Sequence, residues 1–168
     1  MSKDQASLDA QNRVIELFQK DPKAALSTVQ VSARLGDGLY CTVKEADHEL
    51  AMDLPPVVGG ENAAPGPGVF ARAALAGCIL QVLKLTAIRK GIDLGEIELS
   101  LEVDFDDAVM FGLGQNQSPI LRSRITISTD VDLPQPDLEA LVFESLEMDP
   151  YFLAWRNQQE VKVDVKRN

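Results

Sequence analysis

The chain has 168 residues, of which 45% are apolar and 25% are charged, and its formal net charge is −10. This length is typical of one domain, and this apolar content is enough for a core, so we expect one domain over residues 1–168. The acidic balance argues against a nucleic-acid partner, which would need clustered Lys and Arg. The N-terminal residues lack the apolar stretch and cleavage site of a secretory signal, and we expect a cytoplasmic protein.

The first part of the chain predicts a helix and then a strand meander. Residues 1–22 place apolar side chains at helical spacing, with Ser7 as the expected cap. Residues 26–54 alternate apolar and polar side chains around a turn at Gly36-Asp37-Gly38 and a polar break at 45–47. This pattern is typical of three antiparallel strands joined by short turns.

A long apolar helix is predicted for residues 69–90, after a loop rich in proline and glycine and before Gly91. Arg72 and Lys84 interrupt its apolar surface, so we expect a buried helix and no membrane anchor. The helix is apolar on most sides, and one modest sheet can cover only one of them. We therefore expect a homodimer whose central helices meet.

Residues 96–168 predict strands and C-terminal helices. Two alternating segments, 96–105 and 120–131, predict strands, and a helical pattern that follows is interrupted at Pro150. A last alternating segment, 160–166, predicts a closing strand. The whole chain therefore predicts an α+β fold with antiparallel sheets and a long central helix.

The two cysteines are the residues most able to carry chemistry. Cys78 lies midway along the central helix with no cation of that helix beside it, so it is either an inert core cysteine or a thiol activated from another element. Cys41 falls on the apolar face of a strand, where core packing is expected. His48 is the single histidine, and no metal-ligand or nucleotide-binding spacing is present, so we expect no metal and no cofactor.

Several motifs in order resemble the OsmC/Ohr family. The matching places are His48, Asp53 with Pro55, Gly59 and Gly60, Pro67, Cys78, and Ala87 to Ile92. The resemblance implies an OsmC-like α+β fold in which antiparallel sheets surround a buried central helix. It also implies an intertwined homodimer.

In this family the helix cysteine reduces organic hydroperoxides and a second cysteine, in a Cys-Pro motif, resolves it to a disulfide. The resemblance makes Cys78 the peroxidatic residue. Asp149 stands before Pro150 where the second cysteine is expected, and Gly68 stands where the family has a Glu. Arg34, in the first hairpin, is the counterpart of the arginine that holds the thiolate. The chain is thus similar to an atypical member without the resolving cysteine.

Three functions follow as expectations. In the first, Cys78 takes part in a peroxide stress response by reducing an organic hydroperoxide, an external thiol restores it, and Phe70, Ala74 and Leu75 bind the substrate. In the second, the protein is a non-catalytic binder of an apolar or thiol-containing small molecule in the dimer cleft. The third is a structural relative with neither role.

Overall fold

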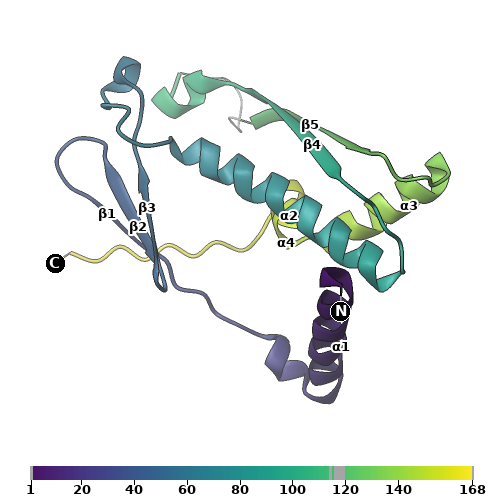
Figure 1. Ribbon diagram of the computed structural model, residues 1–168. Helices are drawn as coiled ribbons and strands as arrows, with labels where there is room; N and C mark the ends of the chain where they lie inside the picture. Colours follow the sequence, from purple (N-terminus) through teal and green to yellow (C-terminus); the bar gives the residue numbers. More distant parts are fainter. Residues whose placement is uncertain (1, 114, 116–119, 168) are drawn as a thin grey trace. The chain divides into compact units, whose positions relative to one another are not determined.

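The computed structural model describes residues 2–113, 115 and 120–167. They form two compact units, one up to Ala74 and one from Leu75, and the boundary falls within the long helix α2 (Pro67–Arg89) (Figure 1). The loop predicted between the two strands of the second unit includes 114 and 116–119, which lie outside the described residues. The assignment of 1–168 to one domain stays a prediction.

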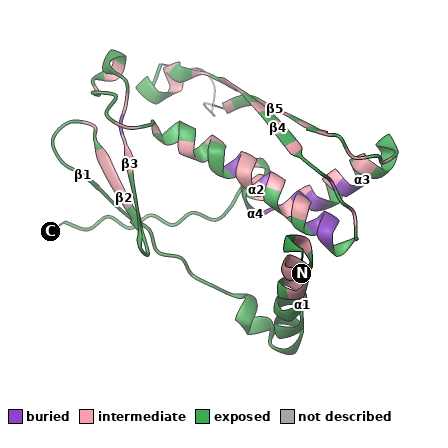
Figure 2. Cartoon of the chain, in the orientation of Figure 1, coloured by how far each residue is buried: buried purple, intermediate pink, exposed green. Residues whose placement is uncertain are grey.

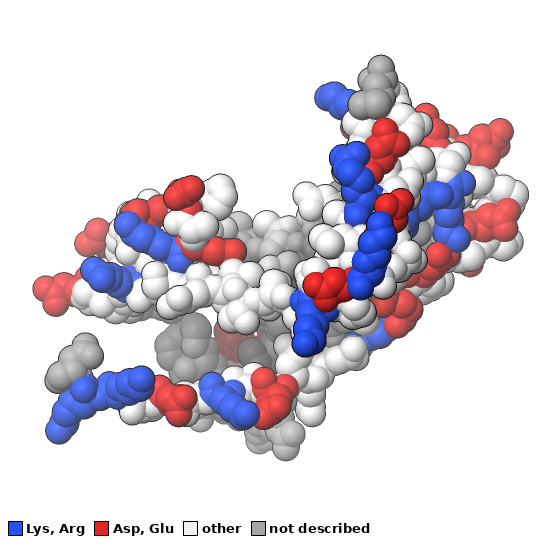
Figure 3. All heavy atoms as spheres, turned by 90° about the horizontal axis from the view of Figure 1, so that it is seen from below, with Lys and Arg blue, Asp and Glu red and all other residues white. Residues whose placement is uncertain are grey.

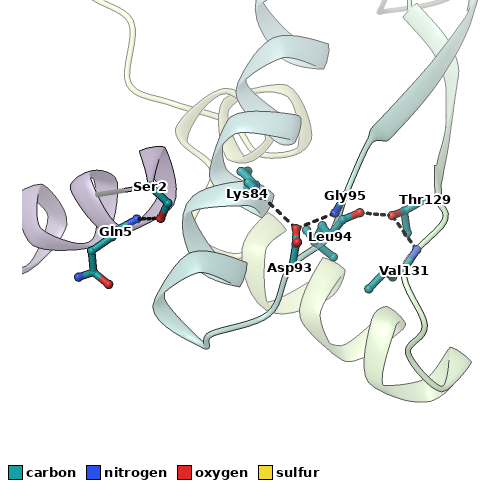
Figure 4. A network of polar contacts seen from close by, with 8 residues as sticks. All are labelled: Ser2, Gln5, Lys84, Asp93, Leu94, Gly95, Thr129 and Val131. Carbon is teal, nitrogen blue, oxygen red and sulfur yellow. Dashed lines mark hydrogen bonds and ion pairs between the residues drawn. The ribbon is translucent and has the colours of Figure 1, made fainter.

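Helix α1 (Lys3–Lys20) begins four residues before the expected cap. Ser2, not Ser7, caps it, because the Gln5 N–H donates to Ser2 Oγ at 3.1 Å (Figure 4). The helix ends before the Asp-Pro pair, as expected, and a short 3₁₀ turn, η1 (Pro22–Ala25), follows. None of the described α1 side chains is buried.

The predicted meander is confirmed as an antiparallel sheet in the order β1 (Ser32–Leu35), β2 (Cys41–Glu45) and β3 (His48–Met52). The glycine turn joins β1 to β2. A two-residue turn joins β2 to β3, and Ala46 in it has a φ of 49°, which lets Glu45 pair with His48. The two tight turns therefore fix the register of all three strands.

Helix α2 follows a loop that contains the 3₁₀ turn η2 (Pro56–Val58), and its bounds match the predicted range within two residues. It ends at Arg89. Gly91, in the turn that follows, has a φ of 69°, which suits glycine, and the Ile92 N–H donates to the Ala87 carbonyl at 2.9 Å. Among the described residues it is the one helix long and apolar enough to cross a membrane, a test that core helices also pass. Only 17% of its most apolar window is buried within this chain.

The core of the second unit lies where α2 ends. The other elements are the hairpin β4 (Ile97–Phe105) and β5 (Ile120–Thr129), with the 3₁₀ turn η3 (Asp107–Phe111) after β4, and helix α3 (Gln135–Leu146). Buried positions gather on the second half of α2 and on α3 (Figure 2). The cluster comprises Leu83, Ala87, Leu94 and Leu141, with Ile97, Ile127, Leu138 and Val142 packed against it.

Polar contacts fasten the chain between α2 and β4 to the end of β5 (Figure 4). Asp93 lies 3.8 Å from the Lys84 ammonium and accepts the Gly95 N–H at 3.0 Å. The Thr129 hydroxyl donates to the Leu94 carbonyl at 2.6 Å. Because Leu94 is fully buried, this bond satisfies a carbonyl that water does not reach.

Helix α4 (Pro150–Arg156) confirms the predicted interruption at Pro150, but the expected closing strand is wrong. Residues 160–166 form no strand, and Val161, Val163 and Val165 are 79%, 79% and 93% exposed. A strand needs a partner edge for its backbone hydrogen bonds, and no described strand of this chain pairs with the segment.

Acidic and basic side chains lie beside one another on the face shown in Figure 3. In the second unit, Lys90 lies 2.8 Å from Glu144, and Arg124 binds both oxygens of Asp104 at 2.7 and 2.9 Å. These pairs are exposed, and exposed ion pairs contribute little to stability. The second unit therefore depends mainly on its apolar cluster.

Candidate functional site

Cys78 lies in α2, between two buried positions, Leu75 and Ile79, and is itself half-buried. Burial raises the pKa of its thiol, and the Asp149 carboxylate raises it further, while the backbone N–H of Tyr151 acts in the opposite direction. The thiol thus meets the start of α4 through a carboxylate and a backbone donor. At neutral pH this setting favours the thiol over the thiolate.

Asp149 serves as the N-cap of α4 and is also the acidic neighbour of the thiol. Its Oδ1 accepts the Phe152 N–H at 2.6 Å, which satisfies one of the free donors of the helix start. The residue is 1% exposed, and among the described residues Oδ2 has no hydrogen-bond partner of ordinary geometry. Asp149 therefore brings to the Cys78 thiol a buried carboxylate whose Oδ2 receives no N–H or O–H donor among the described residues.

Two side-chain contacts hold α4, and with it Asp149, in place. The Trp155 indole N–H donates to Ser123 Oγ on β5 at 3.0 Å. Arg156 binds both oxygens of Glu147 at 2.6 and 3.0 Å, and this ion pair lowers the pKa of Glu147. A paired guanidinium and carboxylate on either side of Asp149 limit its movement relative to α3.

The loop before α2 is organised by Asp53. This buried carboxylate accepts the N–H groups of Leu54, Glu61 and Ala63 at 2.7, 3.1 and 3.0 Å. The Ala63 bond is the main cause of a lowered Asp53 pKa; burial opposes it, and the other two bonds add to it. Gly60 is required here, because a Cβ would collide with the Leu54 carbonyl. Asp53 is thus a structural residue of the loop.

Arg34, expected to hold the thiolate, lies exposed on β1 opposite Thr42. It lines a hollow of 330 Å³ on the face of the first sheet, together with Ser32, Thr42, Lys44 and Glu49. Lys44 and Glu49 pair there at 2.8 Å. Arg34 belongs to the first unit and Cys78 to the second, so their pairing stays a prediction.

The expected substrate-binding residues all lie on α2 and differ in exposure. Phe70 is half-buried, Ala74 is exposed and Leu75 is 1% exposed. Their role stays a prediction, although Leu75 is in core packing in this chain. Cys41 is half-buried on β2, and its thiol lies 3.8 Å from the Thr42 carbonyl oxygen.

Other candidate groups give no site of their own. His48 is exposed at the start of β3. Within the described part of the chain, no three His, Cys, Asp or Glu side chains are grouped as metal ligands would be. The sequence did not predict the Tyr151 N–H beside the thiol, because every residue except proline has a backbone N–H and no residue type marks the one that will face a thiol. The sequence did single out Asp149, by its position before Pro150, but it did not predict that Asp149 is buried or that it interacts with Cys78.

Comparison with known proteins identifies the family to which the chain belongs. Residues 59–164 match the family model described as OsmC-like protein. An uncharacterized protein of Haloferax volcanii is 29% identical over 84 residues, which cover 49% of this chain and 60% of that protein. The chain thus matches less than two thirds of that relative's length.

Solved structures agree on the fold. The crystal structure of an organic hydroperoxide resistance protein OsmC from Legionella pneumophila has a TM-score of 0.57 at 23% identity, covering 78% of this chain and 90% of that one. An OsmC-like protein from Mycoplasma pneumoniae has a TM-score of 0.63 at 14% identity, with 77% and 88% covered. The family model covers well over half of the chain, and both structures share its α+β architecture with antiparallel sheets and a long helix. The chain therefore belongs to the OsmC-like protein family.

Proposed function

We propose that the protein acts in the response to peroxide stress as a one-cysteine thiol protein, in which Cys78 reduces an organic hydroperoxide. The observation that carries this proposal is the half-buried Cys78 thiol at the middle of α2, faced by the Tyr151 N–H and by Asp149. Its position in the chain matches the reactive helix cysteine of the family. The fold shared with an organic hydroperoxide resistance protein supports the choice of substrate class.

The proposed reaction has two stages. The Cys78 thiolate attacks the outer peroxide oxygen of ROOH and, with one proton, yields a sulfenic acid and the alcohol ROH. An external small-molecule thiol then attacks the sulfur, releases water and forms a mixed disulfide, which a second thiol reduces. A cytoplasmic location would supply such thiols. The external thiol is needed because Asp149 stands where the family has its resolving cysteine.

Residues of β1 and of α2 itself would assist this reaction. Arg34 supplies the positive charge that favours the thiolate, and Phe70 and Ala74 offer apolar surface to the organic part of the peroxide. The raised pKa of Cys78 leaves a small thiolate fraction at neutral pH. We therefore expect turnover that is slow and that rises with pH.

The proposal is tested with the variants Cys78→Ser and Cys41→Ser, with cumene hydroperoxide as substrate and dithiothreitol as reductant. Loss of peroxide is followed against a protein-free control. Cys41→Ser is expected to keep the wild-type rate, and Cys78→Ser to fall to the rate of the buffer, because a hydroxyl is not oxidised by peroxide. Full turnover by Cys78→Ser would refute the role of Cys78.

We also propose that the working form is a homodimer. Only 17% of the most apolar window of α2 is buried by its own chain. A second copy of the chain would cover this apolar surface. This assembly would also form the cleft into which the second candidate function places its ligand.

That second candidate is a non-catalytic binder of an apolar or thiol-containing small molecule, and the raised Cys78 pKa favours it. If the protein is such a binder, native mass spectrometry of the purified protein should give twice the 18.3 kDa chain mass plus the mass of a bound small molecule. A dimer without bound mass, together with hydroperoxide turnover, would exclude this candidate in favour of the first. If neither a bound ligand nor hydroperoxide turnover is found, the structural role is the candidate that remains.

A further inference from the structure

The buried Oδ2 of Asp149 is the feature of this site that the proposed reaction does not explain. Capping of α4 engages Oδ1 alone, since the Phe152 N–H donates to that atom at 2.6 Å. Oδ2 is buried, in a side chain that is 1% exposed, and no N–H or O–H group of the described residues donates to it. The Cys78 thiol, a weak donor, is the neighbour of this carboxylate. A buried carboxylate oxygen that receives no strong donor is costly, so a stronger donor formed on the neighbouring sulfur would be stabilised there.

The sulfur of Cys78 can supply that donor once it is oxidised. A thiol is a weak hydrogen-bond donor, whereas a sulfenic acid carries an O–H group on the same sulfur. We infer that Asp149 Oδ2 accepts the O–H of the Cys78 sulfenic acid and holds it in the neutral form, which protects it from further oxidation. This inference deepens the proposed function and rests on it.

The protection follows from the species that reacts in the second oxidation. A sulfenate anion, Cys–SO⁻, attacks a second ROOH and takes up one proton, which gives the sulfinic acid Cys–SO₂H and ROH; the sulfur loses two electrons and the peroxide gains them. The anion is the nucleophile in this step. A carboxylate beside it disfavours ionisation by like charge, and an accepted O–H bond favours the neutral acid.

This chain has more need of such protection than a two-cysteine relative. Where a second thiol stands beside the sulfenic acid, it closes a disulfide at once. Here Asp149 occupies that place, and the sulfenic acid lasts until an external thiol reaches it. Sulfinic acid is not returned to the thiol by ordinary thiols, so each second oxidation would inactivate one site.

Asp149→Asn is the sharpest test, because asparagine caps helices about as well as aspartate. Its side-chain oxygen can accept the Phe152 N–H, while its NH₂ takes the place of Oδ2 and cannot accept a hydrogen bond. Asp149→Ser is the second variant, which keeps a capping oxygen and removes the charge. Both are made with Cys41→Ser, so that Cys78 is the single thiol. Fluorescence of Trp155, the only tryptophan, reports whether α4 is still docked.

The two oxidations are measured separately by intact mass. One equivalent of cumene hydroperoxide or of hydrogen peroxide adds one oxygen atom, and dimedone capture confirms the sulfenic acid. A second dose then gives the rate constant for addition of the next oxygen. We expect this second rate constant to be about tenfold higher in Asp149→Asn and Asp149→Ser than with Asp149, as one pKa unit of easier ionisation would give.

Each outcome bears on one or both proposals. Equal second rate constants in the folded variants and the parent would overturn the protective role and leave the proposed function intact. Sulfenic acid formed by hydrogen peroxide but not by cumene hydroperoxide would overturn the organic substrate, and a second dose of hydrogen peroxide would still decide the role of Asp149. Failure of both peroxides to oxidise Cys78 would overturn both.

Discussion

Asp149→Cys is expected to turn Cys78 from a thiol that oxidises alone into one half of an internal disulfide. The Asp149 side chain contacts the Cys78 thiol, and the position before Pro150 is the one that carries the resolving cysteine in the family. A thiol introduced there would attack the sulfenic acid, release water and close the bond. The substitution also removes the carboxylate that raises the Cys78 pKa, so the first oxidation should be faster as well.

The measurement is intact mass after one equivalent of cumene hydroperoxide, in the Cys41→Ser background. The expected product lacks two hydrogen atoms and has no free thiol, whereas the parent gains one oxygen. Loss of the cap should reduce stability by about 1 kcal/mol, which leaves the protein folded. Asp137→Cys, at an exposed position in the first turn of α3, is the matched control and should form no internal disulfide. A persistent sulfenic acid in Asp149→Cys would show that the two sulfurs cannot meet.

The same stretch shows how far a sequence can predict a site. The Asp149-Pro150 pair indicates a helix start, because aspartate caps helices and proline suits their first turn. Its equivalence to a family cysteine made it a candidate for chemistry. Its burial and its contact with Cys78 could not be predicted, since both depend on how α4 docks on distant elements. The Trp155 to Ser123 bond, which spans 32 residues, is one such contact.

Local patterns predicted most of the secondary structure, and one failure is informative. Turns with glycine and the end of α2 before Gly91 depend on backbone preferences of a few neighbouring residues, so they could be predicted. The strand expected at 160–166 has an equally clear alternation. Alternation indicates only that a segment could pair with the edge of a sheet. Within this chain, no described strand pairs with residues 160–166.

Asp53→Asn is expected to release the loop that leads into α2. The carboxylate receives the N–H groups of Leu54, Glu61 and Ala63, and bonds to a charged acceptor are stronger than bonds to a neutral one. Asparagine has one oxygen for these three donors, and its NH₂ would face the others. Amide hydrogen exchange at Glu61 and Ala63 should therefore be faster by about tenfold or more at pH 7. Asp37→Asn, in the exposed first hairpin turn, should leave both amides unchanged.

The effect of pH on this loop has a definite sign. The three N–H donors hold the pKa of Asp53 below its ordinary value, with Ala63 the main cause, so folding favours the charged carboxylate. The stabilisation is therefore complete above the ordinary Asp pKa of about 4 and is lost as the pH falls through the lower folded value. Protection of the Glu61 and Ala63 amides, corrected for intrinsic exchange, should fall with acid in the wild type and stay low and flat in Asp53→Asn. A wild-type loop whose protection did not change down to the lowest pH at which the protein stays folded would contradict the role of the charge. The route from β3 to α2 would then depend on backbone contacts such as that of the Gly60 N–H with the Pro55 carbonyl.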